Sequence, residues 1–226
     1  MAKKTIRSRR REESLTRERI IDAAIELLDI SGESGLTFRA LSEHLATGAG
    51  AIYWHIANKG DLLTAACDAI IARTMKTHAT RTTPKVAIRA VALGMFDAID
   101  AHPWVGSTLI RAELQSPMVR VVERIGQQVR ALGVPKEKQW AAVSALFSYI
   151  LGVGGQNAAN RHLARTRGLD RGDFLEAMST VWSQLNPEEY PFVHSAAGQL
   201  RTHDDRVDFL TGIDLILKGI DSQQRR

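Results

Sequence analysis

Apolar residues recur every three or four positions along most of the chain, in blocks separated by short polar or glycine-containing breaks. The first block, residues 20–28, follows Thr16, a good helix N-cap, and ends at Ser31 and Gly32. A block with this spacing and these boundaries predicts an α-helix.

Two short helices are predicted next. Thr37 can cap the first of them, whose buried side would carry Leu41 and Leu45. The small residues at 46–48 form a turn, and a third helix is expected over residues 49–55. Several short helices are therefore packed into the first third of the chain.

A longer helix is predicted to begin at Asn58. Asp61 lies three residues later, at the position where a capping box carries its acidic partner. Apolar residues then continue at helical spacing to Ile71, so this helix forms a connector to the rest of the chain.

Beyond the polar break at residues 78–84 the predicted helices are longer. They cover residues 88–99, 118–132, 136–161, 174–185 and 207–220, and residues 186–203 are interpreted as a loop. The helix over 136–161 is apolar on more than one face, which requires burial on both sides. No alternating strand pattern or internal repeat occurs, so the predicted class is all-α.

Composition narrows the type of protein. The 226 residues are 44% hydrophobic, which is typical of a globular protein with a real core. Cys67 is the single cysteine, so no disulfide can form within the chain. We find neither a signal peptide nor an apolar run near the roughly 20 residues of a membrane span, and expect a soluble cytoplasmic protein.

Positive charge is concentrated at the start of the chain. Residues 1–19 contain eight basic and three acidic side chains, a surplus that accounts for the net charge of +5 of the whole chain. A basic run attached to a neutral body suits a flexible arm, residues 1–15, that meets a polyanion. The alternative is a solvated terminus that only aids solubility.

Two short helices joined by a tight turn are the outline of a helix-turn-helix, whose second helix enters the DNA major groove. Gly48, Ala49 and Gly50 fit the start of such a helix, because small residues let the backbone approach bases and phosphates closely. A helix placed only for packing gains nothing from two glycines. We include Thr47 with these three residues as candidates for DNA binding.

The polar residues that follow fit phosphate contacts. Tyr53, His55 and Lys59 can all reach phosphate oxygens, which fix the position of a protein on DNA without reading its sequence. Lys59 is the sharpest indication, because a cation in the first turn of a helix opposes the helix dipole, whereas a phosphate there is favoured by both. Alone, each of these residues is more typical of a core or a surface.

The segment GLTFRALSEHLATGAGAIYWHIANKGDLL, residues 35–63, strongly resembles the DNA-binding domain of the TetR (tetracycline repressor) family. It has the Leu-Thr helix start, the turn, and Tyr-Trp-His followed by Asn-Lys and Leu-Leu. Residues 208–221, DFLTGIDLILKGID, look like the last helix of the regulatory domain of that family. The resemblance implies a helix-turn-helix domain over residues 16–60 and a helical regulatory domain over 61–226.

Position by position, the resemblance implies that Thr37, Tyr53, His55 and Lys59 contact phosphates. Arg39 matches a family position that can read a base, and an arginine can make a bidentate contact to guanine.

Other positions concern packing and the operator. We expect Trp54 to be a packing and wedge residue. Gly48, Ala49 and Gly50 replace larger polar residues of the tetracycline repressor itself, so the operator should differ. Backbone approach, thymine methyl groups, DNA shape and the basic arm should carry more of the recognition.

The resemblance also implies a homodimer with a four-helix bundle, bound to a near-palindromic operator. The sequence supports this, because the helices over 136–161 and 207–220 are too apolar to be covered by one chain. Gly152, Gly154 and Gly155 would allow close helix approach. The alternative is that both helices are core of a monomer.

Family members usually bind a small molecule in the larger domain and then release DNA. Aromatic residues and methionine predict a mostly apolar effector, which can be aromatic. The candidate pocket residues are Trp104, Leu109, Met118, Val122, Phe147 and Trp182, with Arg111, Gln156 and Asn157 as candidate polar anchors. No cofactor is expected. Magnesium-tetracycline is not expected either, because residues 102–113 place no histidine where the metal-binding one of the tetracycline repressor would align.

The sequence bears on two other classes of function. The chain has no G-x-S-x-G, H-E-x-x-H or Walker-type motif, and GVGGQN lies within a helix, so an enzyme is disfavoured. Cys67 has no evident catalytic partner. A DNA-binding protein controlled by a protein partner, or without an effector, stays open, and so does activation in place of repression.

Overall fold

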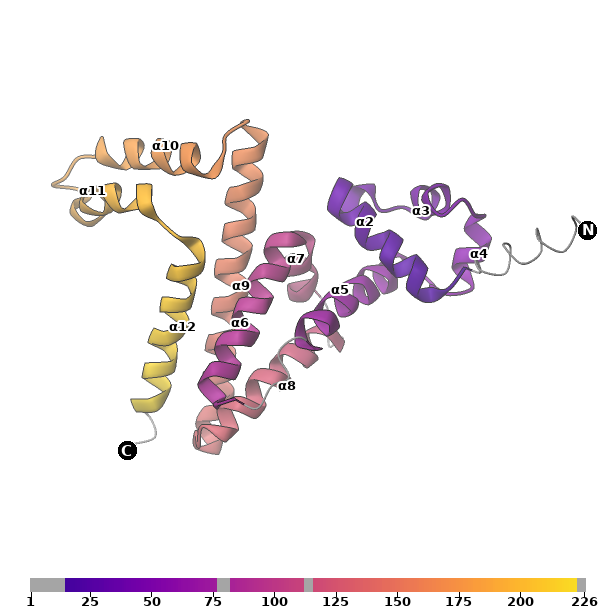
Figure 1. Cartoon of the computed structure of the whole chain (residues 1–226), viewed down its shortest axis with the longest axis horizontal. Coiled ribbons are helices and arrows are strands. Elements are labelled where there is room, and N and C mark those ends of the chain that lie inside the picture. Colours follow the sequence, from indigo (N-terminus) through magenta and orange to yellow (C-terminus); the bar gives the residue numbers. More distant parts are fainter. Residues whose placement is uncertain (1–14, 77–81, 112–115, 223–226) are drawn as a thin grey trace, which may run out of the picture. The chain divides into compact units, whose positions relative to one another are not determined.

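The structure is a computed structural model that describes residues 15–76, 82–111 and 116–222, apart from the side chain of Ser116. All regular elements in these stretches are helices (Figure 1), so the predicted all-α class is confirmed. The chain divides into two compact units and passes from one to the other near residues 76, 103 and 120. The positions near 103 and 120 lie before α7 (Trp104–Arg111) and within α8 (Ser116–Ala131), outside the loops expected from sequence. The functional boundaries at residues 15 and 60 stay predictions.

The first unit holds the N-terminal helices and one helix from further along the chain. Its elements are α2 (Arg17–Gly35), α3 (Phe38–His44), α4 (Ala49–Tyr53), α5 (Lys59–Lys76), α7 (Trp104–Arg111) and the start of α8 (Ser116–Ala131). Its core is formed by side chains such as Ile20, Leu28, Leu41, Ile52, Leu62 and Ile71, each at most 2% exposed.

The predicted caps of this unit are confirmed. The hydroxyls of Thr16 and Thr37 each accept a hydrogen bond from the backbone N–H three residues later, at 3.2 and 3.0 Å. Asn58 Oδ1 accepts from the backbone N–H of Asp61 at 2.9 Å. The regular part of α2 breaks at Gly32, whose φ of 64° is left-handed, as the sequence predicted.

The second unit is built from the longer helices. Its elements are α6 (Pro84–Ala101), the rest of α8, α9 (Lys136–Thr166), α10 (Arg171–Ser183), α11 (Pro191–Ala196), the 3₁₀ helix η1 (Ala197–Thr202) and α12 (Asp205–Ser222). Helices α6, α9 and α12 pack on one another (Figure 1), whereas α11 and η1 pack on α10.

The stripe predicted on α6 is confirmed, since Ile88, Val91, Met95 and Ile99 are all at most 1% exposed. A Cβ added at Gly154 of α9 would lie 3.1 Å from Ile99 Cδ1, so this glycine does permit close approach of α6 and α9.

One expectation for this unit needs correction. Residues 186–203 are not a loop, because Pro191 starts a helical turn and η1 follows, both too short to show an apolar period. Trp140 of α9 is 70% exposed within this chain. Gly152 and Gly155 have open space beside them within this chain, so their expected part in close helix approach stays a prediction.

No helix in the described part of the chain is both long and apolar enough to cross a membrane.

Candidate nucleic-acid interface and effector cavity

Helices α3 and α4 and the turn between them form the helix-turn-helix of the first unit. Ala46 adopts a left-handed φ of 50°, and the Thr47 N–H donates to the Ser42 carbonyl at 2.9 Å. Leu41 of α3 and Ile52 of α4 are fully buried, so they fix the two helices to the body of the unit. The opposite side of α4 is thereby left to solvent.

The start of α4 is exposed and lacks bulk. Gly48, Ala49 and Gly50 are all exposed, and a Cβ added at either glycine would meet nothing within 4 Å. Packing within the chain therefore does not require these glycines, and Gly50, which lies inside the helix, costs about 1 kcal/mol relative to alanine. An external surface that approaches the backbone closely would account for them.

Aromatic residues mark the end of α4. The ring of Tyr53 stacks on that of Phe38 with centroids 4.4 Å apart and an interplanar angle of 4°, which orients the tyrosine while leaving it 55% exposed. Trp54 is 89% exposed, so the expected packing role is wrong within this chain. His55 is also exposed. These side chains border the start of α4 with polar groups and ring surface.

Arg39 lies on the surface of α3, with 89% of its side chain exposed. Its Nε donates to Glu43 Oε1 at 2.9 Å, one helical turn later. An exposed pair of this kind contributes little stability in water. The guanidinium can therefore exchange this partner for another acceptor at small cost.

Lys59 begins α5, as predicted, but it is half-buried. Its ammonium donates a hydrogen bond to the backbone carbonyl of Glu33, near the end of α2. An ammonium carries three donors, so the bond to Glu33 leaves others for a phosphate. This contact could not be predicted from the sequence, because 26 residues separate the two partners.

Three residues predicted to line an effector pocket instead belong to contacts of the first unit. Trp104 Nε1 donates to Asp29 Oδ1 at 2.8 Å, and Arg111 pairs with the carboxylate of Glu33. Leu109 is fully buried. Helix α7 is thus fixed to the end of α2 by several polar contacts.

A cavity of about 300 Å³ lies in the second unit, between α6, α9, α10, η1 and α12. Among the predicted pocket residues, Gln156, Asn157 and Trp182 line it. Met118, Val122 and Phe147 are half-buried and do not line this cavity, so the structure does not gather the predicted set in one place.

Most of the cavity lining was not anticipated. It consists of the facing sides of three helices with additions from α6 and η1: Tyr149, Val153 and Asn160 on α9, Arg171, Leu175 and Met178 on α10, Asp205, Asp208 and Phe209 on α12, and Phe96, Leu200 and His203. The α9 and α10 positions recur at helical spacing, but nothing in the sequence shows that these faces meet.

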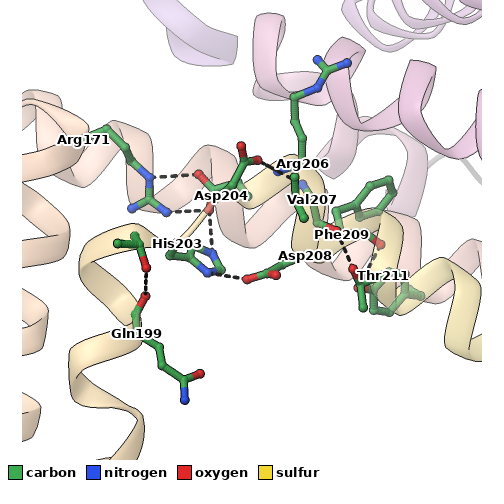
Figure 2. Close-up of polar contacts among 12 residues, drawn as sticks. Arg171, Gln199, His203, Asp204, Arg206, Val207, Asp208, Phe209 and Thr211 are labelled. Carbon is green, nitrogen blue, oxygen red and sulfur yellow. Dashed lines mark hydrogen bonds and ion pairs between the residues drawn. The ribbon is translucent and has the colours of Figure 1, made fainter.

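Charged groups of the cavity are paired with one another (Figure 2). The Arg171 guanidinium makes two hydrogen bonds to the Asp205 carboxylate, at 2.9 and 2.5 Å. His203 bridges two carboxylates, with Nε2 3.1 Å from Asp205 Oδ1 and Nδ1 2.6 Å from Asp208 Oδ2. These pairs tie the start of α10 to the start of α12.

Asn157 connects the cavity to α6. Its Nδ2 donates to Asp100 Oδ1 at 3.1 Å, and the same carboxylate pairs with Arg161 at 2.6 Å. Burial raises the pKa of Asp100 above its ordinary value, although the nearby Arg161 acts in the opposite direction. Asn157, which is buried, therefore holds the end of α6 against α9.

An apolar groove runs along α9 and α12 on another part of the second unit. Its volume is about 460 Å³, and its lining is Val134, Lys138, Ala141, Ala142, Ala145, Ile216, Gly219 and Ile220. Leu215 of α12 is 63% exposed. Small residues on α9 opposite larger ones on α12 suit the packing of further helices.

Other sites are not indicated among the residues described. No group of three or more histidine, cysteine, aspartate or glutamate side chains there could hold a metal ion. Cys67 is fully buried, and burial, with Asp68 nearby, raises the pKa of its thiol to about 12. This thiol is protonated at neutral pH, which agrees with a structural role.

The chain is similar to known transcriptional regulators. The profile described as "Bacterial regulatory proteins, tetR family" matches residues 20–66, and "Tetracyclin repressor-like, C-terminal domain" matches residues 85–224. An HTH-type transcriptional regulator of Saccharopolyspora erythraea is 28% identical over 149 residues, 66% of this chain and 63% of that protein. The HTH-type transcriptional repressor DrrR1 of Streptomyces coeruleorubidus is 24% identical over 95% of this chain and 80% of its own length.

A solved structure agrees over nearly the whole chain. The transcriptional regulator SCO7222, a TetR from Streptomyces coelicolor, is 50% identical and superposes with a TM-score of 0.84, covering 93% of this chain and 100% of that one. The first profile covers the helix-turn-helix, and the second covers the longer helices that follow it, together with α7, which the structure groups with the first unit. Regulators of this kind are not enzymes, which removes the enzymatic alternative. The chain belongs to the TetR family of DNA-binding transcriptional regulators.

Proposed function

We propose that this regulator is a repressor that binds a palindromic operator as a homodimer and leaves it when a small molecule binds. The observation that carries the proposal is the exposed start of α4, where Gly48, Ala49 and Gly50 face open space beside the exposed Tyr53. In a helix-turn-helix this is the part that enters the major groove.

The DNA-contacting residues follow from this placement. Thr37, Tyr53, His55 and Lys59 contact phosphates, and Arg39 reads a base. Residues 47–50 let the backbone approach the groove, and Trp54, with 89% of its surface exposed, is available to wedge against the DNA. The basic arm of residues 1–15 lies outside the described residues, and its part in DNA binding stays a prediction.

The dimer is supported by the groove on α9 and α12. Its lining is mostly small and apolar side chains of two helices, and a second copy that offers the same two helices would fill it and complete a four-helix bundle. A two-fold dimer requires half-sites related by the same symmetry, hence a near-palindromic operator. Because such a protein acts on chromosomal DNA, we also propose the bacterial cytoplasm as its location.

Repression is the default consequence of a dimer that occupies an operator, because it blocks access to the promoter. The resemblance to a repressor, DrrR1, favours this over activation. Release by a small molecule requires that the ligand prefer the conformation that does not fit DNA. Control by a protein partner remains the second candidate, and DNA release by a small molecule alone would distinguish the two.

Selection of bound duplexes from a random DNA pool, at near-physiological salt, tests this function. We expect a palindromic winner bound by two chains, with binding lost in a variant that lacks residues 36–56. A pool without enrichment, together with salt-sensitive binding that survives in this variant, would contradict the proposal, because the basic arm alone would then bind DNA.

A further inference from the structure

The cavity between α9, α10 and α12 has an uncommon combination of lining groups for its size. At about 300 Å³ it lies at the small end of the ~300–1,000 Å³ typical of ligand pockets. It combines aromatic rings, free side-chain amides and charged groups that are already paired. Each of the three restricts the kind of molecule that fits.

Aromatic rings form one side of the cavity. Phe209 stacks with Phe96 at 4.7 Å between ring centroids and with Tyr149 at 5.6 Å, at interplanar angles of 27° and 14°. The indole of Trp182 lines the same cavity from α10. Nearly parallel rings favour a flat aromatic molecule that can add to the stack.

Two amides supply hydrogen bonds. Gln156 and Asn160 lie one turn apart on α9, and both line the cavity. No hydrogen bond of either side-chain amide occurs within residues 15–76, 82–111 and 116–222, whereas the neighbouring Asn157 is held by Asp100. An amide both donates and accepts, so these two suit a hydroxyl or a carbonyl group.

The ionisable groups argue against a charged ligand. Arg171 is paired with Asp205, and His203 lies between Asp205 and Asp208 (Figure 2). An anion that entered the cavity would meet the carboxylates of Asp205 and Asp208, and a cation would have to displace Arg171 or His203 from them.

We propose that the effector binds in this cavity and is an uncharged, planar aromatic molecule with a hydroxyl or carbonyl group. The inference rests on the proposed function, in which a small molecule controls DNA binding. It differs from the sequence-based prediction in its location, since the six predicted residues from Trp104 to Phe147 take no part in it. It keeps Gln156 of α9 as a polar contact, as the sequence predicted, and adds Asn160 in place of Asn157, whose amide is held by Asp100.

The cavity also offers a route to the rest of the chain. Asn157 holds Asp100, the second-last residue of α6, and the chain passes from there through Pro103 into α7. Helix α7 holds α2 through Trp104 and Asp29. A ligand that shifts α9 or α10 therefore acts on an element that leads directly, along the chain, to the contacts of the first unit.

The test uses 3-hydroxyflavone, an uncharged planar molecule with a hydroxyl and a carbonyl, and its 4′-carboxylate derivative as a charged match. Full-length protein is titrated without DNA, and protein and probe fluorescence are recorded. We expect saturable binding of 3-hydroxyflavone at one site per chain and at least about tenfold weaker binding of the carboxylate. No saturable binding, or equal affinity for both, would overturn the proposal.

Variants locate the site. Gln156→Leu and Asn160→Leu should each weaken the binding of 3-hydroxyflavone by about three- to tenfold, which is the effect expected from the loss of one hydrogen bond. Gln127→Leu, on exposed α8 surface, is the matched control and should change nothing. Trp182→Phe should retain most of the affinity but lose most of the quenching of protein fluorescence. Unchanged affinity in both amide variants would place the ligand elsewhere.

A gel shift with the selected operator separates this inference from the proposed function. Addition of 3-hydroxyflavone should release the operator from wild type and less readily from Asn160→Leu. Specific operator binding without the expected ligand pattern leaves the function standing and overturns the site. Probe binding that follows the variants but leaves operator occupancy unchanged overturns the assignment of the site to the effector.

Discussion

Individual side chains of the helix-turn-helix serve both the fold and the proposed contacts with DNA. Thr37 caps α3 through its hydroxyl oxygen, which leaves the hydroxyl hydrogen for a phosphate. Lys59 holds the carbonyl of Glu33 with one of three donors. Substitutions at such positions change stability and binding together unless they are chosen to separate the two.

Thr37 offers that separation. Thr37→Asp keeps a good N-cap, so thermal stability should be at least that of wild type, but the carboxylate repels a phosphate and operator binding should fall by at least about tenfold. Thr37→Ser keeps both roles and serves as the control. Thermal melts and gel shifts measure the two effects, and full operator binding by Thr37→Asp would contradict the phosphate contact.

Arg39 and Lys59 should differ in their effect on sequence specificity. Lys59→Ala should weaken binding to all DNA sequences about equally, because phosphates carry no sequence information. Arg39→Ala should in addition relax the preference at one base pair per half-site by about 1–3 kcal/mol. Competition with operators changed at single positions measures this. Equal losses across all base substitutions in both variants would remove Arg39 as a reader.

Cys67 should be unreactive in the native protein. Its pKa is raised to about 12, so the thiol stays protonated at all pH values below that, and the thiolate that reacts is scarce. We expect labelling by a disulfide reagent at pH 8 to be slow and to accelerate as urea unfolds the protein. Rapid stoichiometric labelling without urea would show that the first unit opens at Cys67.

At the scale of elements, the short helix α4 contains a glycine, Gly50, which lowers its stability. Gly50 lies within the five residues of α4 and has open space beside it. Gly50→Ala should raise stability by up to about 1 kcal/mol, because alanine has the higher helix propensity. It should nevertheless weaken operator binding, since the added methyl group meets the DNA.

Gly126→Ala is the matched control for Gly50→Ala. Gly126 lies within α8, where an added Cβ would be in ordinary contact, 3.9 Å from Val143 Cγ2. This variant should also gain stability and should bind the operator as wild type does. If Gly50→Ala binds normally as well, the backbone of α4 does not approach DNA closely.

Element boundaries were predictable where signals are local. The caps at Thr16, Thr37 and Asn58 each depend on atoms within three residues, and all three are confirmed. The prediction of a loop over residues 186–203 was wrong. Helices α11 and η1 have six residues each, too few for an apolar period, and they are held by packing on α10. Trp140 is exposed within one chain, and periodicity shows that its face is apolar but not what covers it.

At the scale of the whole molecule, the groove on α9 and α12 should bind a second copy. Ala145→Arg places a charge in the groove without removing a core side chain, since Ala145 is exposed within one chain. We expect the mass in solution to fall from that of a dimer to 24.9 kDa, with loss of operator binding.

A control for Ala145→Arg is Ile30→Arg on α2, where the replaced side chain is 80% exposed and lies in the first unit. This variant should keep the dimer mass. Light scattering after size-exclusion chromatography measures both. A wild-type chain that is monomeric at micromolar concentration, or an Ala145→Arg variant that stays dimeric, would place the interface elsewhere or remove it.

The sequence by itself determined the helical class, the caps, the turn of the helix-turn-helix and the family, because each depends on residue type and on spacing over a few positions. The tertiary structure decided what lies between elements. It joins Lys59 to Glu33 across 26 residues, Arg171 to Asp205 across 34 and Trp104 to Asp29 across 75. Such contacts depend on which helix faces meet, and helical periodicity identifies a face without identifying its partner.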